Sequence, residues 1–158
     1  MALDVRATVE PHYPIRRSQI IKTAKVTLEK IAPTSDTSVA IAIIGDRKMR
    51  VLNRDFRGQD KTTDVLAFPF DAQSQGSSGF VNPPNSEVLN LGDVIISYPQ
   101  LLVRAAKEDM LVDEMLNLLV VHGILHLFGY DHEKPQETFA MEKLEETILK
   151  EISVPKII

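Results

Sequence analysis

The sequence predicts a single α/β domain in which a small mixed β-sheet is packed by helices. Short segments rich in β-branched residues alternate along the chain with longer segments of helical period, which is the pattern of an α/β fold. The 158 residues are enough for one domain, residues 1–158, that buries a core without disulfide bonds. One helical segment near residue 120 is apolar on nearly every side, so we expect a central, buried helix.

The first third of the chain predicts two strands separated by a helix. Residues 3–9 alternate loosely between apolar and polar positions and predict a strand. A helical period then runs from 19 to 32, where Ser18 is placed to cap the helix and Pro33 to end it. Residues 39–44 form a continuous, β-branched apolar run typical of a strand covered on both faces, so we place it centrally in the sheet.

A basic helix is predicted to begin at Gly45-Asp46 and to reach about residue 57. Its buried stripe is predicted to consist of Met49, Leu52 and Phe56. Four arginines recur at i, i+3, i+7 and i+10 on the opposite side: Arg47, Arg50, Arg54 and Arg57. Guanidinium groups engage two phosphate oxygens at once, which makes this face a candidate phosphate-binding surface. A solvated charged face, partly neutralised by nearby aspartates, explains the spacing equally well.

The middle of the chain predicts two more strands joined by a loop. Residues 65–70 form the first, and Pro69 indicates an edge or the end of the strand. Residues 71–87 are rich in Ser, Gly, Pro and Asn and predict a mobile loop. The second strand spans 88–98, where Gly92 indicates a β-bulge or a close approach of another backbone. The adjacent Asp93 is either directed at a functional group or an ordinary turn or edge aspartate.

Three helices are predicted in the last third of the chain. The first begins at Pro99, and the second, which Asp113 can cap, carries the apolar run. The third spans 135–152 and has three expected packing residues, which are Phe139, Leu144 and Ile148. Its glutamates are expected on the outside, at Glu142, Glu145 and Glu146.

The segment from His122 to His132 holds three of the chain's four histidines and predicts a metal site. His122 and His126 project from one face of a helix, one turn apart. Gly129 can adopt the left-handed conformation that ends the helix, so the chain can turn back and bring His132 towards the first pair. Three neutral imidazoles leave one position of a tetrahedral ion open, which is the pattern of a catalytic Zn2+, one per chain.

The same histidine spacing occurs in the metzincin peptidases, with one departure. Those enzymes have a glutamate directly after the first histidine, whereas this chain has Gly123. That carboxylate is the base that deprotonates the zinc-bound water. Its absence argues against a peptidase and leaves other metal-dependent hydrolases open.

The composition narrows the functional classes further. The chain has no cysteine, which excludes disulfides and thiolate zinc ligands and is compatible with a reducing compartment. No apolar run is long enough to cross a membrane, and the first residues lack the form of a secretory signal, so we expect a cytoplasmic protein without membrane association. A net charge of −4 argues against a generally basic nucleic-acid binder but leaves room for a local basic patch.

Three segments of the chain together carry a family resemblance. In chain order they are Asn53–Arg57 with the Thr-Asp-Val-Leu-Ala-Phe-Pro run at 63–69, then Leu91–Ser97, then His122–His132. Together they resemble the signature of the YbeY family of bacterial endoribonucleases and rRNA maturation factors. The resemblance covers most of the domain, and the joint occurrence of the segments is more specific than any one of them. Two features depart from the family pattern: Ala67, where serine is commoner, and the insert-like stretch 74–86, which leaves loop contacts to substrate open.

The resemblance implies a zinc-dependent endoribonuclease that acts on single strands in maturation of the 16S rRNA 3′ end and in ribosome quality control. Its implied partners are rRNA and the small ribosomal subunit, and its implied zinc ligands are His122, His126 and His132. The family's functional arginine falls on Arg57, in agreement with the basic face. We expect Arg57 to neutralise charge that develops on the phosphorus during metal-assisted cleavage, and the other three arginines of this face to follow the RNA backbone.

Several alternatives stay open at this point. The attacking group is either a metal-bound water or the ribose 2′-hydroxyl, and a 2′,3′-cyclic phosphate product would exclude the water. Two other functions are compatible with the sequence. One is a non-catalytic, rRNA-binding assembly factor with structural zinc, and the other is a metallopeptidase-like hydrolase, against which Gly123 argues.

Overall fold

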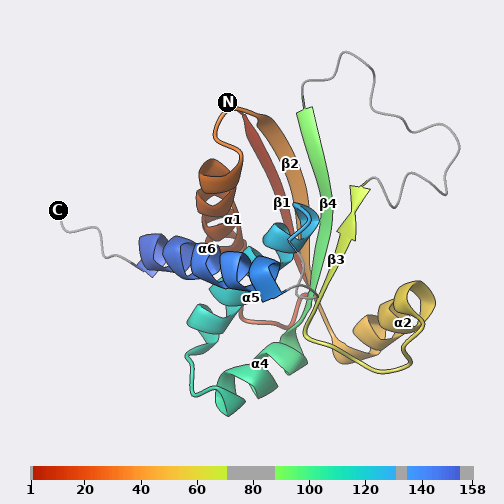
Figure 1. Ribbon diagram of the computed structural model, residues 1–158. Helices are drawn as coiled ribbons and strands as arrows, with labels where there is room; N and C mark the ends of the chain where they lie inside the picture. Colours follow the sequence, from red (N-terminus) through yellow and green to blue (C-terminus); the bar gives the residue numbers. More distant parts are fainter. Residues whose placement is uncertain (1, 71–87, 131–134, 154–158) are drawn as a thin grey trace, which may run out of the picture.

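The computed structural model describes residues 2–70, 88–130 and 135–153 (Figure 1). Within them, four strands form one sheet in the order β1-β2-β4-β3. The strands are β1 (Leu3–Val9), β2 (Asp36–Ile44), β3 (Val65–Pro69) and β4 (Val88–Ser97). The first three in sheet order are parallel, and β3 runs antiparallel to β4 at the edge. The predicted α/β class with a small mixed sheet is confirmed, and so are the central place of β2 and the edge place of the strand that carries Pro69.

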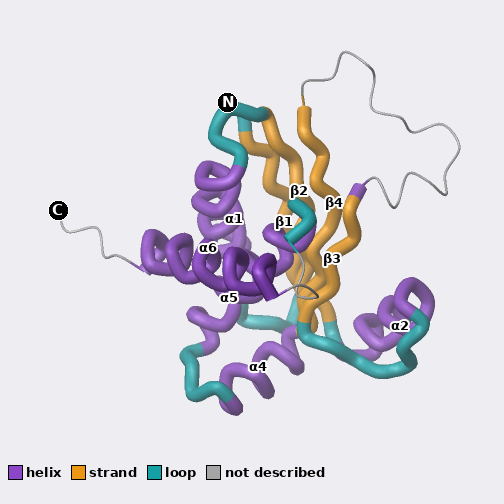
Figure 2. The backbone as a smooth tube through the Cα atoms, viewed as in Figure 1, coloured by secondary structure: helices purple, strands orange, loops and turns teal. Residues whose placement is uncertain are grey.

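Five helices accompany the sheet in the described residues (Figure 2): α1 (Arg17–Ile31), α2 (Asp46–Arg57), α4 (Tyr98–Lys107), α5 (Val112–Leu127) and α6 (Pro135–Ser153). In Figure 1, α1, α5 and α6 lie together on one side of the strands, whereas α2 lies beyond the edge strand β3 and contacts β4 and α4. No single described helix is long and apolar enough to cross a membrane.

The apolar helix α5 occupies the centre of the fold, as its sequence predicts. It packs against α1, α4, α6 and the neighbouring strands β3 and β4. Residues such as Leu119 and Ile124 are fully buried in the main core with β2 and β4. Two others, Val121 and Leu125, join Met141 of α6 in a second cluster. Since each such side chain contributes about 1.5–3 kcal/mol when fully buried, the helix is held firmly on two sides.

Gly92, inside β4, lies both at a β-bulge and at a close approach of another backbone, the two alternatives that the sequence predicted. The pairing of β4 with β2 shifts register at Ser38 and Val39, which marks a bulge. Gly92 has a φ of +125°, and a Cβ built there would lie 2.1 Å from the carbonyl oxygen of Phe68 on β3. A side chain is therefore excluded both by backbone conformation and by the neighbouring strand.

The same register decides where Asp93 points. Val94 faces α5, because its side chain lies against Gly123 of that helix. Successive side chains alternate between the faces of a strand, so Asp93 projects from the opposite face, where it stands across from Phe68. Asp93 is thus not directed at the histidine helix.

Three helix starts differ from the predictions by one or two residues, and one of them is α4, which begins at Tyr98 and not at Pro99. Helix α1 begins at Arg17 and has no side-chain cap, so Ser18 lies within its first turn and does not cap it. Helix α5 begins at Val112 and not after Asp113. There the Glu114 carboxylate accepts a hydrogen bond of 3.2 Å from the backbone N–H of Leu111, and this local contact sets the start of the helix.

Two phenylalanines predicted to be buried are exposed. Phe139 is 67% exposed because α6 uses Met141, Leu144 and Ile148 as its packing stripe, and residue 139 lies on the opposite side of that stripe. Phe56 is on the same side of α2 as the fully buried Met49, but it is 68% exposed because this end of α2 extends past the edge of the sheet.

Candidate functional site

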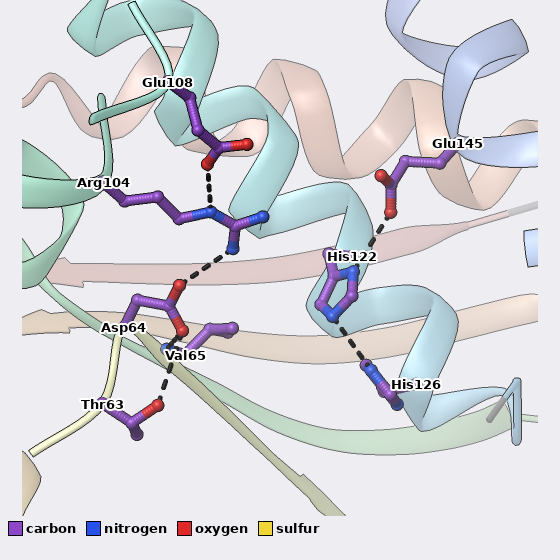
Figure 3. Close-up of polar contacts among 8 residues, drawn as sticks. All are labelled: Thr63, Asp64, Val65, Arg104, Glu108, His122, His126 and Glu145. Atoms are coloured by element: carbon purple, nitrogen blue, oxygen red, sulfur yellow. Dashed lines mark hydrogen bonds and ion pairs between the residues drawn. The ribbon is translucent and has the colours of Figure 1, made fainter. Parts of the chain in front are cut away.

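The first two predicted metal ligands come together on one face of α5. His122 and His126 direct their Nε2 atoms at each other, 3.0 Å apart (Figure 3). Their spacing of four residues on a regular helix produces this convergence. Two nitrogens that each bind a tetrahedral zinc at about 2.0–2.1 Å are separated by about 3.3–3.4 Å. The observed pair is close to that separation, so the two imidazoles fit a shared ion.

A carboxylate from another helix supports the first histidine. Glu145 Oε2 on α6 lies 3.1 Å from His122 Nδ1 (Figure 3). Both side chains are largely shielded, with exposed fractions of 19% for His122 and 17% for Glu145. A carboxylate that accepts the Nδ1–H proton leaves Nε2 unprotonated in a neutral imidazole and turns its lone pair towards an ion.

The sequence-based prediction placed Glu145 on the outside of the last helix and was wrong. The residue lies four positions after the buried Met141 and three before the buried Ile148, so the helical period puts it at the border of the packing stripe. That spacing was the available signal. Its significance depends on where α6 crosses α5, and this crossing is a feature of the tertiary structure.

The third predicted ligand, His132, lies outside the described residues. In the part of the chain that is described, no group of three or more His, Cys, Asp or Glu side chains is placed to hold a metal ion. The described residues therefore provide two converging imidazoles, and the complete ligand set stays a prediction.

The end of α5 has the geometry that the glycine predicted. Gly129 has a φ of +94°. Its N–H donates to the carbonyl of His126 at 2.9 Å, and the N–H of Tyr130 donates to the carbonyl of Leu125 at 3.2 Å. This pair of bonds is the Schellman motif, in which a left-handed residue ends the helix and reverses the chain. It closes α5 directly after the histidine pair and fixes the helical turn that carries His126.

Gly123, which stands where metzincin peptidases have their glutamate, is a packing contact. A Cβ at this position would lie 2.5 Å from Cγ1 and 3.0 Å from Cγ2 of Val94, whose side chain is fully buried in β4. Helix and sheet approach too closely there for any larger side chain. A glutamate base is therefore sterically excluded from this position, which argues further against a peptidase.

The four predicted phosphate-binding arginines, Arg47, Arg50, Arg54 and Arg57, are all exposed on α2. Five basic and two acidic residues give this helix a formal charge of +3, whereas the whole chain carries −4. Arg50 pairs with Asp60 at 2.8 Å and Arg54 with Asp55 at 3.0 Å. Arg47 and Arg57 form no ion pair with any described residue. The basic face thus exists as predicted. Two of its four guanidinium groups take part in no ion pair among the described residues.

Polar contacts with β4 and α4 hold α2 in place. The Asp46 carboxylate in its first turn accepts hydrogen bonds from Thr62 at 2.7 Å, Ser97 at 2.9 Å and Gln100 at 3.0 Å. Burial raises the pKa of this carboxyl, but the three hydrogen bonds outweigh it, so the pKa lies below its usual value. Asn53, which is 2% exposed, donates to the carbonyl of Lys61 at 2.8 Å.

Asp64, from the Thr-Asp-Val-Leu-Ala-Phe-Pro run at 63–69, has a structural role in the described contacts. Its carboxylate accepts hydrogen bonds from Arg104 Nη1 at 2.8 Å and from the backbone N–H of Val65 at 2.7 Å (Figure 3). Arg104 also donates to Glu108 at 2.6 Å. Burial lowers the pKa of the Arg104 guanidinium, and the two carboxylates more than reverse this effect. The network ties the start of β3 to α4.

Arg57 forms no hydrogen bond or ion pair with His122 or His126, the two predicted ligands that the structure describes. In Figure 1, the end of α2 lies beyond β3, and the histidine end of α5 lies on the other side of that strand. No side-chain hydrogen bond or ion pair joins Arg57 to another described residue. A role for Arg57 at the reacting phosphorus thus stays a prediction, and the arrangement suits a phosphate at some distance from the metal ligands equally well.

Comparison with known proteins now decides the family. The family model described as Endoribonuclease YbeY matches residues 9–153. The chain belongs to the YbeY family. A protein named Endoribonuclease YbeY from Chloroflexus aggregans is 36% identical over 99% of this chain and 100% of its own length. Another so named, from Rhodopseudomonas palustris strain BisB18, is 41% identical over 78% of this chain and 70% of its own.

A solved structure agrees with this assignment. The solution structure of TM1509 from Thermotoga maritima matches with a TM-score of 0.59 and 26% sequence identity, and the match covers 94% of this chain and 88% of that one. The family model and the relatives confirm the YbeY resemblance carried by three sequence segments, and the solved structure confirms the α/β fold.

Proposed function

We propose that this YbeY-family chain is a zinc-dependent endoribonuclease. Its substrate would be single-stranded RNA at the 3′ end of 16S rRNA, and its partners rRNA and the small ribosomal subunit, in rRNA maturation and ribosome quality control. The observation that carries the proposal is the convergence of two imidazole Nε2 atoms, backed by a carboxylate, in a chain whose relatives are named endoribonucleases. When bound, zinc supplies Lewis-acid activation of a phosphate oxygen or of the attacking group.

The chain's own residues would prepare the site for that ion. His122 and His126 hold their Nε2 lone pairs on one side of a rigid, buried helix, with His132 as the proposed third ligand. Glu145 fixes the ring of His122 and keeps its proton on Nδ1. The fully buried side chains of α5 exclude water from behind the pair, which strengthens electrostatic interactions within the site.

The basic helix would hold the RNA strand. Its exposed guanidinium groups can engage the backbone phosphates without regard to base sequence, so binding is expected to weaken as salt rises. Arg57 is proposed as the principal phosphate contact, since it lies at the end of α2 and forms no ion pair with the described residues. Selectivity for rRNA would then arise from RNA shape or from the ribosomal subunit.

Metal content and RNA cleavage should be measured together on matched histidine variants. We expect about one zinc per chain in the wild-type protein and cleavage of a small-subunit rRNA precursor, both lost in His126→Ala. His12→Ala is the control, because His12 is the fourth histidine and lies exposed in the turn after β1. Absence of stoichiometric metal from wild-type protein purified without chelators would overturn the metal site.

A second pair of variants separates a nuclease from an assembly factor that only binds rRNA. Arg57→Ala should keep its metal and lose most of its cleavage, whereas Arg17→Ala, an exposed arginine on α1, should retain wild-type cleavage. If Arg57→Ala cleaves at the wild-type rate with its metal retained, the role proposed for Arg57 is wrong. If the metal-loaded wild type binds the precursor but never cleaves it, the assembly-factor function replaces the nuclease.

A further inference from the structure

Phe56 occupies an unusual position at the end of the basic helix. It is 68% exposed, although it lies on the side of α2 that carries the buried Met49. Its ring meets the ring of Phe68 on β3 edge to face, with centroids 5.4 Å apart. This contact limits the motion of the Phe56 ring, and most of the residue remains open to solvent. Arg57, the next residue, is also exposed.

The charge around this aromatic residue points to an anionic partner. Helix α2 carries a formal charge of +3, so the remainder of a chain with a total of −4 carries −7. An apolar protein partner gains little from such a local concentration of guanidinium groups. Single-stranded nucleic acid combines the two complementary features, since its backbone is anionic and its unstacked bases present flat aromatic faces.

We propose that Phe56, supported by Phe68, is a stacking platform for a nucleobase of single-stranded RNA whose phosphate is bound by Arg57. The inference rests on the proposed function for the identity of the substrate and adds to it a base-binding subsite beyond the edge strand β3. A paired base is already stacked in its duplex and cannot lie on the ring. The platform therefore selects for unpaired RNA and is tolerant of base identity.

A second exposed phenylalanine, Phe139, provides a comparison for Phe56. Isolated hydrophobic residues are common on protein surfaces, and Phe139 is such a residue, with an exposed fraction of 67%. Phe139 lies on α6, away from the basic helix, on a segment where acidic residues are frequent. The two phenylalanines thus match in type and exposure and differ in their electrostatic surroundings.

The absence of tryptophan from the chain allows a direct optical test. Phe56→Trp and Phe139→Trp each introduce a single indole, whose fluorescence is quenched when a base stacks on it. The probes are a short single-stranded RNA and an oligonucleotide with the same backbone but abasic positions. We expect saturable quenching of Phe56→Trp by the RNA and much less by the abasic probe, with Phe139→Trp unchanged by both.

Affinity measurements on the remaining variants complete the test. Phe56→Ala should bind the RNA roughly 5- to 150-fold more weakly, the range that corresponds to base–aromatic stacking, and should bind the abasic probe almost as well as wild type. Phe56→Tyr should restore RNA binding, and Phe56→Leu should not. Equal RNA affinities for Phe56→Ala and wild type would overturn the platform while leaving the nuclease proposal intact. A wild-type protein that neither binds nor cleaves RNA would overturn both.

Discussion

Replacing Gly123 with alanine is expected to destabilise the protein, although alanine is the better helix former. The added methyl would lie 2.5 Å from Cγ1 of Val94, which is closer than two carbon atoms can approach. Val94 is fully buried and its branched side chain has little rotameric freedom, so it cannot swing aside. The helix must therefore move away from β4, and His122, the preceding residue, moves with it.

The effect of Gly123→Ala on the free energy of unfolding is the difference between the cost of overpacking and the gain in helix propensity. Overpacking of a tight core typically costs about 1–3 kcal/mol. Alanine in place of glycine inside a helix returns about 1 kcal/mol. We therefore expect a net loss of up to about 2 kcal/mol in the free energy of unfolding. For a domain of this size, such a loss lowers Tm by up to roughly 8 °C.

A double-mutant cycle isolates the steric term from the helix propensity. Val94→Ala removes the two methyl groups that Gly123→Ala would meet, at a cost of about 1–3 kcal/mol by itself. In that background only the contact of 3.3 Å with Cβ of residue 94 remains, so most of the steric term disappears and Gly123→Ala should stabilise the protein by up to about 1 kcal/mol. Urea denaturation of the four proteins gives the coupling energy, which we expect to be about 1–3 kcal/mol in favour of the double variant.

Additive effects of Gly123→Ala and Val94→Ala on the free energy of unfolding would contradict the predicted steric contact. If Gly123→Ala has the same effect with valine and with alanine at position 94, the helix and strand do not meet as described. Metal affinity gives a second readout of the same variants. Gly123→Ala should bind metal more weakly, because it displaces His122 from Glu145. The double variant should bind metal with an affinity closer to that of the wild type.

Three other variants test the site and its support. Glu145→Gln should lower metal affinity about 10- to 100-fold in a chelator competition, because it removes the charged acceptor of His122 Nδ1, whereas Glu142→Gln on the exposed side of α6 should not. Since the folded-state pKa of Asp46 is lowered, its ionised form stabilises the fold at neutral pH, and this contribution is lost as pH falls through that pKa. Asp46→Asn should thus be less stable than wild type at pH 7, with a gap in denaturation midpoint that narrows on acidification; a gap independent of pH would contradict the role of the charge. Arg57→Ala should reduce the salt dependence of RNA binding by about one ion, and an unchanged slope would argue against a phosphate contact there.

Periodicity was sufficient to predict most of the helices and strands of this protein. The continuous apolar run of β2 and the apolar surface of α5 each predicted an interior element, because only an element surrounded by others can bury so much surface. The spacing of His122 and His126 predicted their convergence for an equally local reason, since four residues make about one helical turn. Gly129 similarly predicted the end of α5 from its own backbone freedom.

Features that depend on how one element meets another were decided only by the tertiary structure. Phe56 has the helical phase of a core residue and is exposed, because α2 extends past the edge of the sheet and leaves it without a surface to cover. Glu145 supports His122 only because α6 crosses α5 at that level. The structural reason for Gly123 lies in a strand almost thirty residues earlier in the chain. Sequence determines the phase of a side chain around its own helix, whereas distance, angle and overhang between elements are set by packing of the whole domain.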